Sequence, residues 1–231
     1  MSRPRVVAHR GASHAHPDNS WAAFDAAIAE GADAVECDVQ LTADGRLVVR
    51  HDLAVGGRLV ADMPAAELMR LEPATVVFDD LVQWQRRTAM GLLVEIKDRA
   101  AVPALAAALP ADAGPEVVVA GFDMLAVSTF KQARPDIPTS LMVGSVLPID
   151  AMIALARQAG AAGVHPCWEA RAPRASTLLT RADVARLQSA GLMVTFWHEE
   201  RAEELQALAA LAPDAICTDT PGQLRQILDA R

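Results

Sequence analysis

The stretch Val35-Glu36-Cys37-Asp38-Val39 decides how this 231-residue chain folds and where its chemistry is expected. Alternate side chains of a β-strand point to opposite faces, so Glu36 and Asp38 share one face while their apolar neighbours share the other. Carboxylates buried this close together repel each other unless a proton or a cation lies between them. The stretch therefore predicts a buried strand that contributes two ligands to a metal ion.

A later stretch, Leu92-Leu93-Val94-Glu95-Ile96-Lys97, repeats the pattern. Its Glu95 and Lys97 share one face of the expected strand, and apolar side chains share the other. Because Glu36, Asp38 and Glu95 offer only carboxylate oxygens, they favour a hard divalent cation, Mg²⁺ or Ca²⁺. Zinc sites, in contrast, usually include His or Cys.

Outward from these two stretches, short apolar segments alternate with helical ones along the chain. This alternation predicts a single-domain α/β fold over residues 1–231, a (β/α)8 TIM barrel, because such barrels reach this length undivided. Nine segments are strand candidates, one more than the barrel needs: 6–9, 34–39, 46–51, 92–97, 117–120, 139–143, 162–165, 192–197 and 215–218. The link between 34–39 and 46–51 is too short for a crossover helix, so we expect one strand to be an extra or a hairpin partner.

Helices are expected between the strands, and residues 53–91 are interpreted as a short irregular insertion after the third strand. Asn19 or Ser20 caps the first helix, and Thr180 with Asp183 forms a capping box for the helix that ends at Gly191. The other helices are expected after Asp62 through Leu71, at 78–90, 101–109, 123–133 and 150–160 and, as the last one, at 200–211. An open doubly wound sheet is the alternative fold, but no Gly-x-Gly-x-x-Gly or Walker-type loop follows a strand.

Composition limits the partners and the compartment. The formal charge is −8, from 21 basic and 29 acidic residues with no basic run, which argues against nucleic acid or an anionic membrane as the main partner. No stretch reaches the roughly 18 apolar residues of a membrane span, and the first apolar run is too short for a signal peptide. Cys37, Cys167 and Cys217 have neither disulfide nor zinc spacing and are expected as buried reduced thiols. We therefore expect a cytoplasmic protein without a stable membrane anchor.

Ionisable residues gather where the strands are expected to end: His9, Glu36, Asp38, His51, Glu95 and Lys97. In a barrel of this kind the reacting groups collect at the carboxyl ends of the strands. The two histidines can serve as general base and general acid, because a histidine pKa lies near neutrality. Each residue alone has a structural explanation, but six such groups at four strand ends are costly to bury without a functional role.

A run of motifs carries a family resemblance. It comprises His9-Arg10-Gly11, Pro17-Asp18-Asn19-Ser20, Ala23-Phe24, Gly31-Ala32-Asp33, Glu36-x-Asp38-Val39, Thr42-x-Asp44-Gly45 and His51-Asp52, followed by Glu95-Ile96-Lys97 and Thr218-Asp219-Thr220-Pro221. In order and spacing these motifs resemble those of the glycerophosphodiester phosphodiesterase family. The resemblance is dense over residues 6–52, sparse over 53–91 and intermittent afterwards.

The resemblance implies a PLC-like phosphodiesterase barrel that hydrolyses small glycerophosphodiesters to glycerol 3-phosphate and an alcohol. Carried onto this sequence, the family's roles fall on three groups: the cation ligands Glu36, Asp38 and Glu95, the proton-transfer residues His9 and His51, and the phosphate-binding residues Arg10 and Lys97. Either water or the substrate's own glycerol hydroxyl fits as the first nucleophile.

Departures from the family pattern lie in loops expected to face the leaving alcohol. Residues 53–58 replace an Arg-Thr-Thr segment, and Trp197-His198-Glu199-Glu200 replaces Trp-Thr-Val-Asn. Trp197 and His198 are therefore candidates for a substrate pocket, with core packing and strand capping as the alternatives. The sequence assigns no role to His14, His16 or His165.

Other functions stay open beside this one. A lysophospholipase D-like or sphingomyelinase D-like lipid phosphodiesterase would need an apolar mouth, and no hydrophobic run occupies 12–20 or 53–60. A non-catalytic phosphodiester-binding barrel would be expected to lack one of the two histidines or three carboxylates, and all five are present. A metal-dependent amidohydrolase barrel is disfavoured, since no His-x-His pair ends the first strand.

Overall fold

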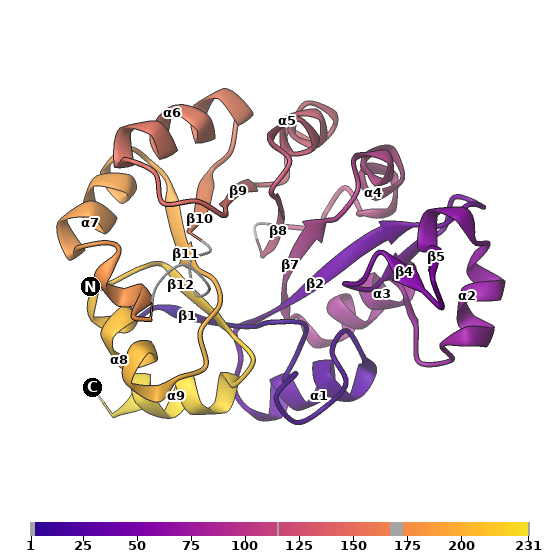
Figure 1. Cartoon of the computed structure of the whole chain (residues 1–231), viewed down its shortest axis with the longest axis horizontal. Coiled ribbons are helices and arrows are strands. Elements are labelled where there is room, and N and C mark those ends of the chain that lie inside the picture. Colours follow the sequence, from indigo (N-terminus) through magenta and orange to yellow (C-terminus); the bar gives the residue numbers. More distant parts are fainter. Residues whose placement is uncertain (1–2, 115, 167–172, 231) are drawn as a thin grey trace.

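The computed structural model describes residues 3–114, 116–166 and 173–230. In this part of the chain eight parallel strands form a closed barrel, because the first strand pairs with both the second and the last. In barrel order the strands are β1 (Arg5–Ala8), β2 (Ala34–Leu41), β7 (Gly91–Ile96), β8 (Val117–Gly121), β9 (Thr139–Val143), β10 (Gly163–Pro166), β11 (Met193–Phe196) and β12 (Ala215–Thr218). The predicted (β/α)8 barrel is confirmed (Figure 1).

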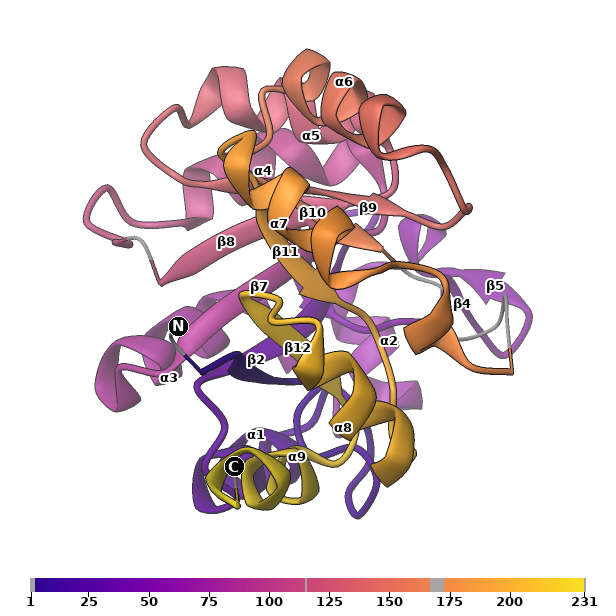
Figure 2. The same cartoon turned by 90° about the vertical axis from the view of Figure 1, so that its left-hand side faces the viewer.

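A layer of helices surrounds the strands, as the two perpendicular views show (Figures 1 and 2). It consists of α1 (Trp21–Ala29), α3 (Phe78–Thr88), α4 (Val102–Ala108), α5 (Met124–Ala133), α6 (Ile149–Ala159), α7 (Arg181–Ser189), α8 (Ala202–Ala210) and α9 (Pro221–Asp229). Two predicted caps are present: the Ser20 side chain accepts from the Ala23 amide at the start of α1, and Thr180 with Asp183 forms a capping box on α7. Such caps satisfy backbone donors that a helix cannot satisfy itself.

The ninth strand candidate is the predicted hairpin partner. It is β3 (Leu47–Val49), which pairs antiparallel with β2 outside the barrel, so that Val49 lies opposite Val39. After β3 come the short strands β4 (Ala54–Val55), β5 (Arg58–Leu59) and β6 (Val76–Val77), with a 3₁₀ turn (Val60–Asp62) and α2 (Ala65–Leu71) between β5 and β6. In Figure 1 this segment lies at one side of the barrel.

Two features differ from the sequence-based expectation. The expected last helix at 200–211 is wrong as the last helix, because α9 follows β12 with Leu224 and Leu228 buried and Pro221 at its start, where a missing N–H costs nothing. The strands β4, β5 and β6 were not expected, because each is two residues long and shows no period-two alternation.

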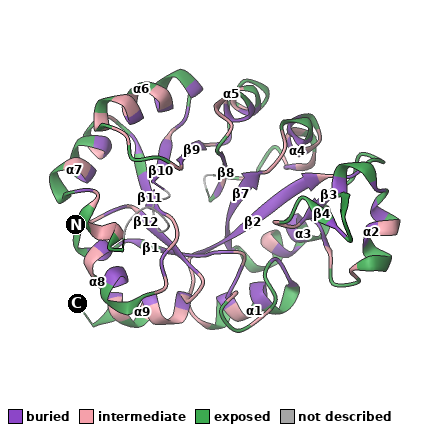
Figure 3. Cartoon of the chain, in the orientation of Figure 1, coloured by how far each residue is buried: buried purple, intermediate pink, exposed green. Residues whose placement is uncertain are grey.

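The larger parts of the core lie between the barrel and its helices, and smaller clusters lie inside the barrel and within the segment from β3 to α2. Val35, Cys37 and Val39 of β2 pack outward with residues such as Phe24 of α1 and Phe78 of α3. A smaller cluster consists of Val7, Ala34, Leu93, Ala120, Met142, Ala215 and Cys217. Trp197 packs against it. Most residues of the eight barrel strands are buried, whereas the outer faces of the helices are exposed (Figure 3). The opposite face of β2, with Glu36 and Asp38, is therefore turned away from the helices.

Cys37 and Cys217 are buried, as expected for thiols in apolar strands. Cys167 lies outside the described residues. In the described ranges, no helix combines the length and the apolar character that crossing a membrane requires.

Candidate functional site

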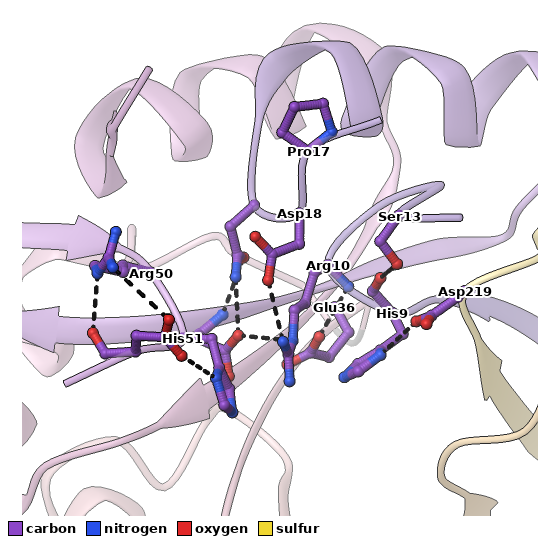
Figure 4. Close-up of polar contacts among 12 residues, drawn as sticks. His9, Arg10, Ser13, Pro17, Asp18, Glu36, Arg50, His51 and Asp219 are labelled. Carbon is purple, nitrogen blue, oxygen red and sulfur yellow. Dashed lines mark hydrogen bonds and ion pairs between the residues drawn. The ribbon is translucent and has the colours of Figure 1, made fainter. Parts of the chain in front are cut away.

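The predicted site residues meet at the carboxyl end of the barrel. His9 and Arg10 follow β1, and the loop after them can turn back because Gly11 adopts a φ of 85° and a Cβ there would lie 2.6 Å from the backbone of Ala23. In Figure 4, Arg10 and Glu36 lie between His51 on one side and His9 with Asp219 on the other.

The three predicted cation ligands form one buried cluster. One oxygen from each of Glu36, Asp38 and Glu95 lies within 4.8 Å of the others, and all three residues are buried. The strand register explains the arrangement, because Asp38 of β2 lies directly opposite Glu95 of β7. Among the described residues, Glu36 Oε1, Asp38 Oδ1 and Glu95 Oε2 are buried without a hydrogen-bond partner. Three buried carboxylates that each bring an oxygen this close to the others fit a hard divalent cation.

The electrostatics of the cluster point the same way. Burial, and then the nearby Asp38 charge, raises the pKa of Glu36 well above its usual range and that of Glu95 to about 7. Burial also acts to raise the pKa of Asp38, but Lys97 and Arg10, with the Asn19 amide, bring it below its usual value. Without a cation, the three carboxylates do not readily ionise together. A divalent cation would remove that repulsion.

Arg10 and Lys97 both face this cluster. The Arg10 amide donates to Glu36 Oε2 at 3.0 Å, and its guanidinium lies 3.2 Å from Asp38 and 3.0 Å from Asp18. Lys97 Nζ lies 3.0 Å from Glu95 and 3.4 Å from Asp38. Three carboxylates and these two cations sum to −1, so adding a divalent cation would make the group +1 and attractive to a phosphodiester anion.

Asn19 is a site residue that the sequence analysis treated only as a helix cap. Its Nδ2 donates to Asp38 Oδ2 at 2.8 Å, and its Oδ1 accepts from the Asp38 amide at 3.3 Å. Asn19 has a φ of 52°, a left-handed conformation that asparagine tolerates better than most residues. Arg10 also has a positive φ, 55°, so both residues of the segment between β1 and α1 that contact Asp38 adopt a sparsely populated backbone conformation.

His9 is held by a carboxylate. Its Nδ1 lies 2.6 Å from Asp219 Oδ1, which assigns the Nδ1 proton to this bond and leaves Nε2, buried and without a partner in the described ranges, as the acceptor nitrogen. Burial lowers the pKa of His9, and the Asp219 hydrogen bond offsets only part of this. The neutral ring with an available Nε2 can accept a proton.

Asp219 was not singled out from the sequence, although it lies in the closing motif. Its partner is 210 residues away in the chain, and no local periodicity reports such a distance. Barrel closure explains the contact, because β1 and β12 are neighbouring strands with Ala8 opposite Thr218. A carboxylate that follows the last strand of a predicted barrel was the available signal.

His51 lies on the other side of the site. It follows β3, its side chain is 37% exposed, and its Nδ1 lies 3.0 Å from Asp52 Oδ1. His51 lines a cavity of about 180 Å³ together with Asp18 and Arg50. This position leaves it open to a bound molecule.

The two predicted pocket residues lie beside His9. The His198 ring stacks on the His9 ring with centroids 4.2 Å apart, and Trp197 meets His9 edge-on at 5.3 Å. His198 Nδ1 lies 2.6 Å from Glu200, and Trp197 also contacts the exposed Phe122. His9, His198 and Asp219 are close enough to share a metal, but the stacked rings are only 21° from parallel and do not converge on one point. The carboxylate cluster is the better metal site.

The remaining three histidines lie outside this arrangement. His14 binds the Asp219 carbonyl at 2.8 Å from the exposed first loop, and His16 lies on the same loop. His165 is buried in β10, where burial lowers its pKa to about 3. A ring that stays neutral this far into acid is poorly suited to proton transfer.

The chain is similar to known proteins in sequence and in fold. The chain matches the model of the glycerophosphoryl diester phosphodiesterase family over residues 9–223. It is 32% identical to the probable glycerophosphodiester phosphodiesterase 1 of Mycobacterium tuberculosis. The match covers 98% of this chain and 93% of that protein. A glycerophosphodiester phosphodiesterase of Caldanaerobacter subterraneus is 26% identical, with 95% of each chain covered.

The fold is likewise similar to that of a solved structure. A phosphodiesterase of Oleispira antarctica, in complex with the product sn-glycerol-3-phosphate, superposes with a TM-score of 0.84. The two sequences are 23% identical, and the superposition covers 98% of this chain and 97% of that one.

Proposed function

From the premise that this chain belongs to the glycerophosphoryl diester phosphodiesterase family, we propose that it hydrolyses glycerophosphodiesters to glycerol 3-phosphate and an alcohol with the help of a divalent cation. The chain is a phosphodiesterase by family membership. The single observation that carries the cation-dependent proposal is a cluster of three buried carboxylates beside Arg10 and Lys97, each with one oxygen that has no hydrogen-bond partner in the described residues.

Glu36, Asp38 and Glu95 would hold the cation, and their oxygen-only chemistry suits Mg²⁺ or Ca²⁺. When bound, such a cation polarises a phosphoryl oxygen and lowers the pKa of an attacking hydroxyl or water. Asn19 orients Asp38 for this role through two hydrogen bonds.

Arg10 and Lys97 would bind the phosphate. Both already face the carboxylate cluster at 3.0–3.4 Å, so a phosphate placed over the cluster comes within reach of the guanidinium and the ammonium group. Arg10 presents several N–H donors in one plane, which suits two phosphate oxygens at once.

His9 would act as the general base and His51 as the general acid. His9 has its Nδ1 proton held by Asp219, so Nε2 is the atom that takes the proton from the attacking water or glycerol hydroxyl. The resulting imidazolium is stabilised by the Asp219 charge. His51, more exposed and on the other side of Arg10, would give a proton to the departing alcohol oxygen (Figure 4).

Trp197 and His198 would form part of the wall around the substrate's organic groups, because both contact the His9 ring. The active enzyme would work in the cytoplasm, a reducing compartment that suits the buried thiols of Cys37 and Cys217.

Release of glycerol 3-phosphate tests the proposal. A panel of glycerophosphodiesters that differ in the alcohol would be incubated with the protein in Mg²⁺, in Ca²⁺ and in EDTA, and the product measured by an enzyme-coupled assay. We expect release that one of the two ions supports and EDTA abolishes. Release that is equally fast in EDTA would exclude the cation-dependent mechanism, and no release from any member would exclude this substrate class.

A lipid phosphodiesterase of the lysophospholipase D type is a second candidate, because one observation favours it. Leu53 and Leu59 are 53% and 51% exposed and line a cavity of about 160 Å³ together with Lys97. An apolar surface of this kind beside a phosphate-binding residue could contact an acyl chain. Turnover of lysophosphatidylcholine faster than that of glycerophosphocholine would support this candidate, and turnover of glycerophosphocholine alone would eliminate it.

A further inference from the structure

Gln40 is a buried polar residue on the functional face of β2. It follows Asp38 by two positions, so its side chain points to the same face as Glu36 and Asp38, and it is only 3% exposed. Its Nε2 donates to three successive backbone carbonyls: Arg50 at 2.8 Å, His51 at 3.2 Å and Asp52 at 2.9 Å. A single side-chain amide thus hydrogen-bonds to all three residues of the turn that includes His51.

That turn needs outside support. The ladder between β2 and β3 ends at Val49, and beyond it the Arg50 amide still bonds to the Asp38 carbonyl at 2.8 Å. The His51 and Asp52 side chains are 37% and 73% exposed. Arg50 Nε also donates to the Asp52 carbonyl at 2.9 Å, so the Arg50 and His51 carbonyls depend most on Gln40. A part-buried carbonyl that loses its donor costs free energy, so the amide of Gln40 stabilises this backbone conformation.

We propose that Gln40 is a positioning residue for His51, holding the proton donor at a set distance from the cation ligands. Glu36, Asp38 and Gln40 are alternate residues of a single strand, so one rigid element sets both ends of the site. The proposal rests on the proposed function of His51 as general acid. Gln40 lines the cavity beside Lys97, but its amide nitrogen is turned to the carbonyls of residues 50–52, so the role we assign to it acts through that backbone.

Displacing a general acid has a specific kinetic signature. An alcohol such as choline needs a proton as it leaves, whereas p-nitrophenolate leaves without one. Gln40→Leu keeps the side-chain volume and removes the donor. We expect it to lower kcat on glycerophosphocholine by about 10- to 100-fold, since misplacement of a reacting group by an ångström can cost about that much. On the p-nitrophenyl diester of glycerol phosphate we expect less than about threefold loss, because this step then depends little on a general acid.

Cation binding separates positioning from general damage to β2. Gln40→Leu should bind the activating cation, titrated by calorimetry, as tightly as the wild type. If Gln40→Leu fails to fold, Gln40→Asn serves the same test, because its shorter amide cannot span three carbonyls. Gln85→Leu is the matched control: the Gln85 amide donates to the Met90 carbonyl at 3.1 Å beyond helix α3, and its loss should leave kcat unchanged on both substrates.

His51→Ala separates a failure of the general-acid role of His51 from a failure of the positioning role of Gln40. If His51→Ala lowers kcat equally on both substrates, or lowers it on neither, the general-acid role in the proposed function is wrong. If His51→Ala instead lowers kcat on glycerophosphocholine alone, the proposed function stands. The positioning role of Gln40 is then overturned if the Gln40 variant keeps wild-type kcat, lowers kcat equally on both substrates or binds the cation more weakly. The same leaving-group dependence in both variants, with cation affinity intact, supports the inference.

Discussion

His9 has three neighbours that set its chemistry. Asp219 holds Nδ1 at 2.6 Å, the His198 ring stacks on it at 4.2 Å, and Trp197 covers its edge. Burial lowers the pKa of His9, and the cationic forms of His198 and Arg10 lower it further against the pull of Asp219. The ring is therefore neutral near pH 7, the state that a general base requires.

Replacing His9 by alanine tests its role most simply. We expect His9→Ala to lower kcat by about 10²- to 10⁴-fold, the usual contribution of a positioned base, with cation affinity within about twofold of the wild type. Steady-state kinetics and a calorimetric cation titration on the same preparation provide both numbers. His16→Ala, on the first loop, is the control and should keep wild-type activity; wild-type turnover by His9→Ala would remove this residue from the mechanism.

Asp219 offers a pH-dependent test. Its hydrogen bond and charge raise the pKa of His9, so Asp219→Asn should lower that pKa and move the acidic limb of the profile of kcat/KM to lower pH. The same change should lower kcat by about 10- to 100-fold, because the imidazolium formed during the reaction loses its counter-charge. A limb that moved to higher pH would contradict the contact between Asp219 and His9.

At the residue scale, sequence reasoning placed the groups that share a strand and missed those that meet through folding. Glu36, Asp38 and Glu95 could be grouped because strand alternation and the common edge of parallel strands are general properties. Asn19 and Asp219 could not, because their contacts depend on a loop conformation with positive φ and on barrel closure. The role of Gln40 could not be predicted from the sequence either, because its hydrogen-bond partners are carbonyls of a later turn.

Strands β2 and β7 carry the charged cluster, and its stability should depend on the cation and on pH together. The folded-state pKa of Glu95 is raised from 4.5 to about 7, and that of Glu36 is raised as well. Folding therefore favours the protonated forms, so the contribution of Glu95 is fully present below about pH 4.5 and is lost as pH rises through 7. A bound cation needs the ionised carboxylates and reverses this loss.

We expect the melting temperature in saturating Mg²⁺ or Ca²⁺ to exceed that in EDTA by a margin that grows from pH 5 to pH 8. His165, whose pKa is lowered to about 3, makes the protein more stable as pH rises from about 3 to 6.5 with or without cation, so it cancels from this difference. Differential scanning fluorimetry over this range provides the measurement. A margin independent of pH, or larger at pH 5, would mean that the cation binds elsewhere.

At the element scale, the long periodic segments were predicted except for α9, and the short ones were not. The barrel strands and the helices between them have apolar patterns that extend over several residues, and two caps were readable from Ser20 and from Thr180 with Asp183. The short link between 34–39 and 46–51 correctly indicated a hairpin. Strands β4–β6 have only two residues each, and their conformation is decided by tertiary contacts.

The whole molecule explains how a chain with a charge of −8 can bind an anion. In the site, Arg10 and Lys97 lie against three carboxylates, and a bound divalent cation would change the formal charge of this group from −1 to +1. Barrel closure brings the first strand between the second and the last, so residues from both ends of the chain complete one site (Figure 1). For this reason we propose that the chain folds as one domain and that removal of β12 and α9 would abolish activity.

The cation dependence of turnover in wild type and Glu36→Gln tests the central claim most directly. Glutamine keeps the shape of Glu36 but removes a charge from the cluster, so we expect the cation concentration for half-maximal glycerol 3-phosphate release to rise at least about tenfold, with a lower maximal rate. A thermal melt in EDTA would check that the variant is folded. An unchanged half-maximal concentration and rate would contradict the account, because the buried carboxylates would then not be the site at which the cation promotes hydrolysis.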